Sequence, residues 1–360
     1  MQKKYKILFH IDLDAFFCAV QEIRYPFLKG KAFAIGREKS RGVIATASYA
    51  ARKYGLKSAM PTHEAIRRCP KVILVSGGGD LYKEYSDKFK DYLAQYATVM
   101  NIASIDECYM DVTEYTMNIH PVELARKIQK DLWDKYRLSA SIGIAPTVYL
   151  SKMASELKKP KGITILRIRE IEKMLYPNPI DTIYGLGKKS SQPLKEAGIL
   201  TIGDFLNKAN VEKISKIIGF RYYEHLVQSL TGKTTNIIES EYKAEKESMS
   251  TSTTFPSDLV QFTEIANEFA KMAMEITEKL KSEKKLIKNV RITLRYPDFK
   301  TITRCRMLKI FTDDYEIINS CVQNLFEDNY NDEPIRLIGV GLSRFAHEEK
   351  KERISLFDLN

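Results

Sequence analysis

The chain has 360 residues and carries 57 Lys and Arg against 46 Asp and Glu, which gives a formal net charge of +11. This length predicts roughly two to four domains rather than one compact core. The excess of positive charge indicates a phosphate-rich partner, such as a nucleic acid or a nucleotide; an ordinary basic surface is the alternative. No run of about 18 apolar residues occurs, so no membrane span is expected, and the charged start MQKKYKILFHID lacks the apolar stretch of a signal peptide.

The cysteines are Cys18, Cys69, Cys108, Cys305 and Cys321. Their number is odd, and no two of them have CxxC spacing. This pattern is typical of reduced thiols and argues against a disulfide framework or a zinc site. We therefore expect a cytoplasmic protein.

Residues 1–168 alternate short apolar runs with amphipathic segments, which is the pattern of an α/β domain. The segments with this pattern are predicted strands at 9–13, 108–112 and 138–144 and predicted helices at 84–100 and 122–136. Strands and helices in this order predict a small mixed sheet with helices on one face.

The composition changes after residue 168 and divides the rest of the chain into four parts. They are a helical, glycine-punctuated part (169–235), a polar linker (236–250), a second α/β unit (251–346) and a charged tail (347–360). In the second α/β unit, apolar residues from Phe262 to Leu280 share one helical face, and residues 289–295 and 301–311 read as strands.

Two acidic clusters lie in apolar surroundings, in the segments IDLD and SIDE. Two strands of one sheet can bring Asp12, Asp106 and Glu107 together. Three carboxylates at one point repel each other and stay ionised only around hard cations, and such a set suits two magnesium ions in phosphoryl transfer. A solvated β-turn is the alternative for Asp106 and Glu107. Asp14 precedes an apolar helical segment and is expected to cap its N-terminus.

Six motifs follow one another along the chain. They are HIDLDAFFCAV (10–20), ATASYAARKYGL (45–56), SAMPTHEA (58–65), SIDECYMDVT (104–113), SIGIAPTVYLSKMASELKKPKGI (141–163) and YGLGKKSSQPLKEAGI (184–199). Together and in this order, they resemble the Y-family of translesion DNA polymerases, of the bacterial polymerase IV kind. The resemblance runs over essentially the whole chain.

The resemblance implies a multidomain α/β (α+β) fold shaped like a right hand. Its expected parts are a ferredoxin-like catalytic palm (1–17 and 77–168), small fingers (18–76), a helical thumb with a helix-hairpin-helix (169–235), a linker (236–250), an α/β little finger (251–346) and a tail (347–360).

The resemblance also assigns roles to the acidic residues. Asp12 and Asp106 would bridge two Mg²⁺ ions, Glu107 would complete the site at the primer 3′-hydroxyl, and the backbone carbonyl of Leu13 would complete the nucleotide-side ion. Phe17 matches the steric gate of the family, a flat aromatic ring that leaves no room for a ribose 2′-hydroxyl. An ordinary core phenylalanine is the alternative for Phe17.

Four further residues are expected to bind the nucleotide. Tyr49 and Arg52 are three residues apart and share a helical face, Arg52 offers a planar donor fork to phosphate oxygens, and Thr46 precedes them. Lys159 matches the triphosphate lysine of the family, and a lysine-rich surface turn is the alternative.

Two segments are expected to bind DNA. Gly185, Gly187 and Lys188 look like a helix-hairpin-helix loop whose backbone N–H groups bind a phosphate without reading the sequence, although Tyr184 stands where the family usually has proline; a plain glycine-rich turn is the alternative. Arg304 and Arg306 alternate onto one strand face and could follow a template backbone, or they could belong to a solvated edge strand.

The tail segment RISLFDL resembles a sliding-clamp-binding peptide, with Leu356 and Phe357 as its apolar anchors. Arg353 occupies the place of the usual glutamine.

These expectations describe a template-directed, DNA-dependent DNA polymerase that performs error-prone translesion synthesis by two-metal-ion nucleotidyl transfer. It would act as a monomer on primer–template DNA and dNTPs. One alternative is a catalytically inactive DNA-binding scaffold of the same family, against which the three carboxylates argue. The other is a nucleotide cyclase with the same palm topology, against which the helix-hairpin-helix loop and the additional domain argue.

Overall fold

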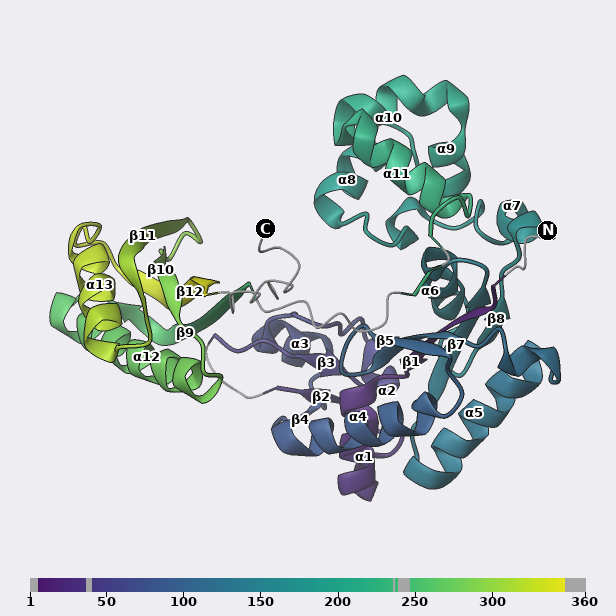
Figure 1. Cartoon of the computed structure of the whole chain (residues 1–360), viewed down its shortest axis with the longest axis horizontal. Helices are drawn as coiled ribbons and strands as arrows, with labels where there is room; N and C mark the ends of the chain where they lie inside the picture. Colours follow the sequence, from purple (N-terminus) through teal and green to yellow (C-terminus); the bar gives the residue numbers. More distant parts are fainter. Residues whose placement is uncertain (1–5, 37–40, 236, 239–246, 347–360) are drawn as a thin grey trace, which may run out of the picture. The chain divides into compact units, whose positions relative to one another are not determined.

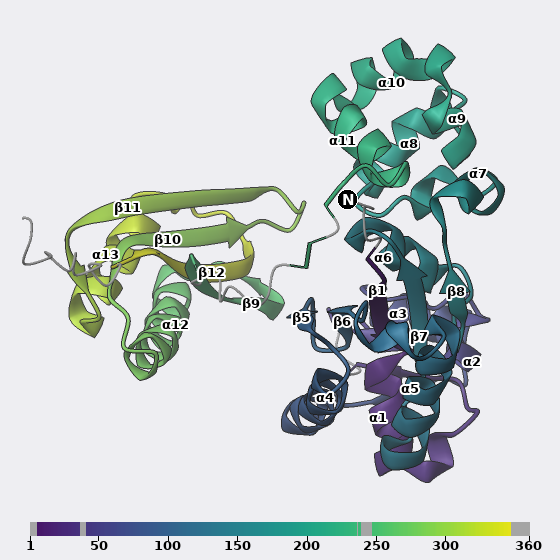
Figure 2. The same ribbon diagram turned by 45° about the vertical axis from the view of Figure 1, so that its right-hand side comes forward.

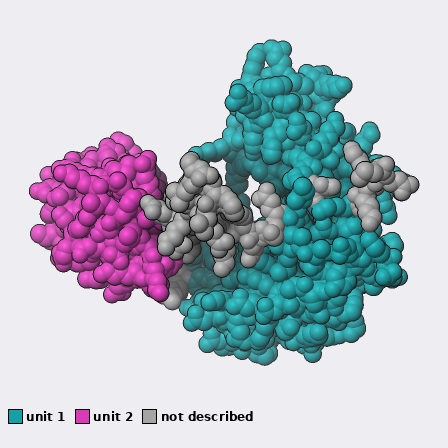
Figure 3. All heavy atoms as spheres, in the orientation of Figure 1, with its two compact units in different colours: residues 1–38, 42–242 teal, residues 39–41, 243–360 magenta. Residues whose placement is uncertain are grey.

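The computed structural model divides into two compact units (Figure 3). The first unit contains residues 1–38 and 42–242, and the second contains residues 39–41 and 243–360. The structure describes residues 6–36, 41–235, 237–238 and 247–346. Leu356 and Phe357 of the predicted clamp peptide lie outside the described residues, as does most of the predicted linker. In the described part of the chain, no helix is both long and apolar enough to cross a membrane.

A five-stranded sheet forms the centre of the first unit (Figure 1). Its strands are β1 (Leu8–Leu13), β5 (Val99–Ile102), β6 (Glu107–Asp111), β7 (Ala140–Ala145) and β8 (Ile163–Ile165). The strand order is β5-β6-β1-β7-β8, in which β1 runs antiparallel to β6 and β7, and β7 runs parallel to β8. The mixed sheet predicted from the sequence is therefore confirmed, with β1 at its centre.

Two amphipathic helices, α4 (Gly79–Ala94) and α5 (Pro121–Tyr136), cover one face of this sheet. Every second residue of β1 points into the core beneath them, namely Phe9, Ile11 and Leu13. The sequence placed the first helix at 84–100, and its end was wrong, because the helix stops at Ala94 and Met100 belongs to β5. Apolar spacing in a short stretch does not distinguish a helix turn from a strand.

A third helix, α6 (Val148–Glu156), packs on the opposite face of the sheet, so the expectation that helices lie on one face only was wrong. Gly143 of β7 permits this close contact. A Cβ atom at Gly143 would lie 2.0 Å from the carbonyl oxygen of Ser151 and 2.4 Å from the backbone nitrogen of Ser155. Because strand side chains alternate, His10 and Asp12 point to the face that α6 covers.

The remaining elements of the first unit form two smaller parts. The part between β1 and α4 contains α1 (Phe16–Arg24), β2 (Phe33–Ile35), β3 (Thr46–Ala47), α2 (Tyr49–Arg52), α3 (Thr62–Arg68) and β4 (Ile73–Val75), with the sheet order β3-β2-β4. The part after β8 contains α7 (Ile171–Met174), α8 (Lys188–Glu196), α9 (Ile202–Leu206), α10 (Val211–Ile218) and α11 (Phe220–Leu230). The helical character predicted for this second part is confirmed, and Leu194, Phe205 and Leu226 lie in its core.

The second unit is a four-stranded antiparallel sheet with two helices on one face (Figure 2). Its elements are β9 (Ser248–Leu259), α12 (Phe262–Ser282), β10 (Ile287–Arg295), β11 (Thr301–Thr312), α13 (Tyr315–Glu327) and β12 (Ile335–Phe345), and the strand order is β11-β10-β12-β9. The predicted helix and the two predicted strands are present. The sequence analysis did not identify β9, whose many Ser and Thr residues conceal its alternation, or β12, which is buried along most of its length and shows no clear alternation.

Candidate active site

Two acidic residues face each other across the central strands. Asp12 of β1 is the register partner of Glu107 at the start of β6. Their neighbours Ile11 and Cys108 point into the opposite core, so both carboxylates lie on the face covered by α6. Asp12 is only 5% exposed, and Glu107 is partly buried. The alternation seen in the sequence therefore does bring these two residues together.

The third predicted carboxylate belongs to Asp106, whose backbone is joined to the end of β1. Its carbonyl oxygen accepts a hydrogen bond from the backbone N–H of Leu13 at 3.0 Å. Its side chain accepts a hydrogen bond from the hydroxyl of Ser104 at 2.6 Å. Among the described residues, no group of three or more Asp, Glu, His and Cys side chains is close enough together to serve as a ready set of metal ligands.

A buried lysine lies between the two facing carboxylates. Lys152 of α6 is 7% exposed, and its Nζ is 2.9 Å from Oε1 of Glu107 and 3.4 Å from Oδ2 of Asp12. The same Nζ is 3.1 Å from Oε1 of Glu156. The sequence analysis missed Lys152. The available signal was a lysine four residues before a glutamate on an otherwise small and apolar helix.

Lys159 also contacts Asp12, as part of the same network. Its Nζ is 2.7 Å from Oδ2 of Asp12 and 2.8 Å from Oε1 of Glu156. The Lys159 side chain is partly buried and paired with these carboxylates, although its neighbours Lys158 and Pro160 are exposed. The structure thus places the predicted triphosphate lysine directly beside a predicted metal ligand.

Burial and charge act in opposite directions on the two facing carboxylates. Burial raises the pKa of Asp12 above its ordinary value, although Lys159 and Lys152 favour its charged form. A hydrogen bond from His10 and the ammonium group of Lys152 hold the pKa of Glu107 well below its usual range, against the effect of burial. The carboxylate oxygens of Asp12 and Glu107 already bind cationic groups, the ammonium groups of Lys152 and Lys159. Carboxylate oxygens are also the ligands that Mg²⁺ prefers, so the donor set fits this ion.

His10 supports Glu107 on the same face of the sheet and was also missed by the sequence analysis. The ring is fully buried, with Nδ1 2.8 Å from Oγ of Ser155 and Nε2 3.3 Å from Oε2 of Glu107. Burial lowers the pKa of His10 to about 4, so the ring is neutral at pH 7. Because the carboxylate can only accept, Nε2–H donates to Glu107, and Nδ1 of the neutral ring is an acceptor that faces the Ser155 hydroxyl.

Asp14 does not cap a helix, so that expectation was wrong. Helix α1 begins after Ala15 without any side-chain cap. The buried carboxylate of Asp14 instead accepts hydrogen bonds from the Ser141 hydroxyl at 2.7 Å and from the backbone N–H of Lys161 at 2.9 Å. Asp14 thereby ties the loop that carries Lys159 to the central sheet.

The residues expected to bind the nucleotide sugar and phosphates lie next to this network. Phe17 of α1 is half-buried, and its ring meets that of Tyr82 edge-on at a centroid distance of 4.6 Å. The guanidinium of Arg52 lies 4.8 Å from the ring centre of Tyr49, and its Nη2 is 3.4 Å from Oγ1 of Thr46. Burial, with the nearby negative charges of Asp14 and Asp12, raises the pKa of Tyr49 to about 12.

The predicted helix-hairpin-helix loop is stiffened by two tyrosines. The hydroxyl of Tyr149 donates to the carbonyl of Tyr184 at 2.8 Å, and that of Tyr222 donates to the carbonyl of Gly185 at 2.6 Å. Gly185 has φ +92°, which only glycine adopts without strain. Gly187 caps the start of α8, where Lys188 is the first residue and is exposed. The loop is therefore held in place although Tyr184 replaces the usual proline.

Arg304 and Arg306 of β11 point toward the helix-covered side of the second unit. They are spaced by two residues from Ile302 and Leu308, which pack against its core, so all four side chains lie on the same face of β11. Nε of Arg304 is 2.8 Å from Oδ1 of Asn329, and Nη2 of Arg306 is 2.8 Å from Oδ2 of Asp328.

The other face of this sheet carries two basic residues that the sequence analysis did not select. Arg291 and Arg295 of β10 alternate with the buried Ile292 and Leu294 and so point away from the helices. Arg291 lies over Gly341, where a Cβ atom would come within 3.0 Å of the guanidinium.

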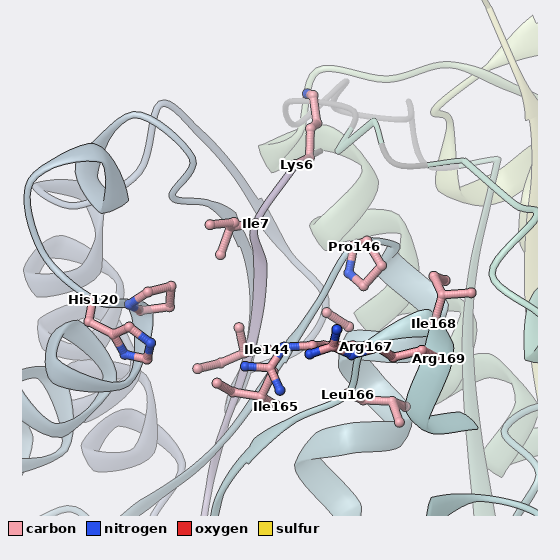
Figure 4. Close-up of a pocket in the computed structure, with 12 residues that line it drawn as sticks. Lys6, Ile7, His120, Ile144, Pro146, Ile165, Leu166, Arg167, Ile168 and Arg169 are labelled. Atoms are coloured by element: carbon pink, nitrogen blue, oxygen red, sulfur yellow. The ribbon is translucent and has the colours of Figure 1, made fainter. Parts of the chain in front are cut away.

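A cavity of about 660 Å³ lies at the opposite end of β1 from Asp12 (Figure 4). Its walls include Ile7, Ile144, Ile165 and Leu166, with Arg167 at the rim. None of the twelve described residues that line it carries a carboxylate, a thiol or a hydroxyl. This cavity is therefore separate from the site that contains Asp12 and Glu107.

Comparison with known proteins identifies the family. Residues 11–156 match the family model described as the impB/mucB/samB family, and residues 246–356 match the model of its C-terminal domain. DNA polymerase IV of Ureaplasma parvum serovar 3 is 38% identical over an alignment of 359 positions, which covers 98% of this chain and 98% of that protein. DNA polymerase IV 1 of Bacillus subtilis is 34% identical over an alignment of 363 positions, which covers 100% of this chain and 87% of that protein.

Solved structures agree with this result. The "Y-family DNA polymerase chimera Dbh-Dpo4(243-245)-Dbh" is 27% identical, with a TM-score of 0.81 over 94% of this chain and 98% of that chain. The "Insertion ternary complex of Dbh DNA polymerase" is also 27% identical and has a TM-score of 0.63 over the same shares of the two chains. The order of motifs, the mixed sheet with its facing carboxylates, and these relatives lead to one conclusion: the chain belongs to the Y-family of DNA polymerases and is similar to bacterial DNA polymerase IV.

Proposed function

We propose that Asp12, Asp106 and Glu107 form the catalytic centre of this DNA-directed DNA polymerase, which carries out translesion synthesis. The main observation in support of this proposal is the antiparallel pairing of β1 and β6. It sets Asp12 opposite Glu107, and a backbone hydrogen bond joins Leu13 to Asp106. In the reaction, the primer 3′-hydroxyl forms a bond to the α-phosphorus of a dNTP, and the bond to the pyrophosphate leaving group breaks.

The three carboxylates and the carbonyl oxygen of Leu13 would hold two Mg²⁺ ions. In such a site, Mg²⁺ supplies a lowered pKa for the attacking hydroxyl and neutralises charge on the phosphoryl oxygens. Glu107 is kept ionised by His10 and Lys152, so it is ready to hold a cation at neutral pH. Asp12 would bind with one oxygen already engaged by positive charge from Lys159.

The protein's own cations would orient the triphosphate. Lys159 lies beside Asp12 and would exchange this partner for phosphate oxygens as the nucleotide enters. Arg52 is exposed and lies over the ring of Tyr49, and it would offer its donor fork to the phosphate oxygens. Tyr49 and Thr46 would add hydroxyl donors to the phosphates.

Phe17 would select deoxyribonucleotides. Its ring is braced by Tyr82, whose hydroxyl accepts a hydrogen bond from Gln21 at 2.8 Å. A ring braced in this way cannot move aside to admit a 2′-hydroxyl.

Primer–template DNA would be held by backbone contacts in both units. The loop at Gly185, Gly187 and Lys188 presents N–H groups at the start of α8 to a phosphate. In the second unit, Arg304 and Arg306 remain candidates, and the helix-free face with Arg291 and Arg295 offers further phosphate contacts. A solved relative is described as an "Insertion ternary complex of Dbh DNA polymerase", and this supports the proposal that the present chain binds DNA and a nucleotide together.

The tail would tether the enzyme to a sliding clamp through Leu356 and Phe357. The enzyme would act in the cytoplasm and as a monomer.

The domain limits expected from the sequence, with the palm at 1–17 and 77–168 and the fingers at 18–76, remain part of this proposal.

A primer-extension assay tests the catalytic assignment. Wild-type protein should extend a primer opposite a template lesion in the presence of Mg²⁺ and dNTPs, and the Asp106→Asn variant should not. The competing hypothesis, an inactive DNA-binding scaffold, predicts that both proteins bind the DNA and neither extends it. The nucleotide cyclase alternative finds no support among the relatives.

A further inference from the structure

In the proposed function Lys152 only helps to keep Glu107 ionised, although it occupies the centre of the charged network. It makes its contacts from a rigid position, because α6 rests directly on the sheet at Gly143. Its Nζ reaches Glu107 at 2.9 Å, Glu156 at 3.1 Å and Asp12 at 3.4 Å. At 7% exposure it has little access to an incoming nucleotide, unlike the less buried Lys159.

The charges around Lys152 are unequal. Three carboxylates, those of Asp12, Glu107 and Glu156, share the two ammonium groups of Lys152 and Lys159. If Lys159 turns to the triphosphate, Lys152 becomes the remaining ammonium group among these described partners. Buried carboxylates without a counter-charge repel each other and are expensive to keep.

A fixed cation next to metal ligands has a second consequence. A divalent ion between Asp12 and Glu107 would lie within a few ångströms of Nζ of Lys152, and two positive charges at that separation repel each other. The lysine that stabilises the metal-free site therefore weakens binding of the metal to that site. The negative charge of a triphosphate would offset this repulsion.

We infer that Lys152 is a built-in counter-charge of the metal site. It holds Asp12 and Glu107 together before the metal arrives, and it keeps the affinity for divalent cations low until a nucleotide is bound. This inference rests on the proposed metal site.

The test uses Mn²⁺ as the probe, with the full-length protein and no nucleotide or DNA. In the Lys152→Met variant the charge is removed and the chain length is nearly kept. Calorimetric titration should show Mn²⁺ bound roughly tenfold or more tightly than in wild type, since removal of a unit charge at this distance changes the affinity by at least that order. The melting temperature should be lower than in wild type without metal, and Mn²⁺ should raise it by a larger amount.

Two controls fix the interpretation. Lys152→Arg keeps the charge and should bind Mn²⁺ like wild type. Lys130→Met makes the same substitution at an exposed helical lysine on α5, and it should change neither Mn²⁺ affinity nor the response of the melting temperature. Equal or weaker Mn²⁺ binding by Lys152→Met would overturn the inference.

A third variant separates this inference from the proposed function. Asp106→Asn added to Lys152→Met should remove most of the gained affinity, because Asp106 does not contact Lys152 but belongs to the proposed ligands. If Mn²⁺ still binds as tightly, Asp106 is not a ligand and the proposed metal site fails. If Asp106→Asn does remove Mn²⁺ binding but Lys152→Met binds Mn²⁺ no more tightly than wild type, only the inference about Lys152 fails. If Lys152→Met cannot fold without metal, recovery of the fold in saturating Mn²⁺ supports the inference, and failure to recover contradicts it; Lys152→Gln, which can still donate hydrogen bonds, should then show the same tighter binding.

Discussion

The buried carboxylate of Asp14 accepts a hydrogen bond from the backbone N–H of Lys161 at 2.9 Å, although 147 positions separate the two residues in the chain. This bond joins the end of β1 to the loop that carries Lys159. The position of Lys159 therefore depends on a carboxylate that touches neither the proposed metal nor the nucleotide.

The first prediction concerns this bond. Asp14→Ala should raise KM for dNTP about tenfold, with a smaller effect on kcat, because loss of a hydrogen bond to a charged group amounts to ~1.5 kcal/mol or more and loosens the binding of the triphosphate. Steady-state primer extension at varied dNTP concentration measures both constants. Ser141→Ala removes only the other partner of Asp14, 2.7 Å away, and should have a weaker effect. An unchanged KM in Asp14→Ala would show that the loop keeps its position without this bond.

The second prediction concerns the proposed metal ligands. Asp106→Ala should reduce nucleotide incorporation by roughly a thousandfold or more, since a metal-binding carboxylate supports several kcal/mol of transition-state stabilisation. Binding of primer–template DNA, measured by gel shift, should stay close to that of wild type. Extension at a near-wild-type rate would exclude Asp106 from the catalytic centre.

The third prediction concerns sugar selection. Phe17→Ala should raise the incorporation of ribonucleotides relative to deoxyribonucleotides by more than about tenfold, the ratio that corresponds to ~1.4 kcal/mol from relief of one clash. Competition between the two substrates in single-nucleotide extension measures this ratio. Phe16→Leu alters the fully buried neighbour and should leave the ratio unchanged. The assignment fails if both variants discriminate as wild type does.

The fourth prediction concerns acid stability. Burial lowers the pKa of His10 from 6.5 to about 4. Below pH 6.5 the unfolded chain binds a proton at His10 that the folded protein does not bind. The contribution of His10 therefore lowers the free energy of unfolding by ~3 kcal/mol as the pH falls from about 6.5 to about 4. Below pH 4 the folded protein also binds this proton, so His10 causes no further loss of stability.

Urea unfolding at several pH values tests this expectation. His10→Gln should lose less stability than wild type between pH 6.5 and 4, whereas His63→Gln, which alters an exposed histidine, should follow wild type. The same pH dependence in all three proteins would contradict a neutral, buried His10.

The fifth prediction concerns the tail, which lies outside the described residues. Leu356→Ala combined with Phe357→Ala should leave extension without a clamp unchanged and remove its stimulation by a clamp, because a tether acts by raising the local concentration of the enzyme at the primer end. Arg353→Ala should weaken the stimulation less than the double variant does, since Arg353 is not one of the apolar anchors. Full stimulation of the double variant would place any clamp contact on the folded second unit.

Several features of this protein could be predicted from the sequence because they depend on local pattern. The two-residue alternation around Asp12 and Glu107 is enough to orient both side chains once β1 and β6 pair. The expected positions of Arg304 and Arg306 on one strand face were also correct, but alternation cannot say which face meets the helices. Met100 was assigned to a helix because apolar spacing over one or two turns fits a strand equally well.

By itself, the sequence determined the family, the mixed α/β class and the helical middle part, and it singled out three carboxylates as candidate metal ligands, since each of these follows from motif order or from short-range periodicity. Only the tertiary structure decided that Lys152 lies between Asp12 and Glu107, that His10 supports Glu107, and that Asp14 holds the Lys159 loop. These contacts join residues 45 to 147 positions apart. The contacts of Lys152 arise where α6 approaches β7 over Gly143, and those of His10 and Asp14 join β1 to other segments. All of them depend on packing between distant parts of the chain, which local pattern does not encode.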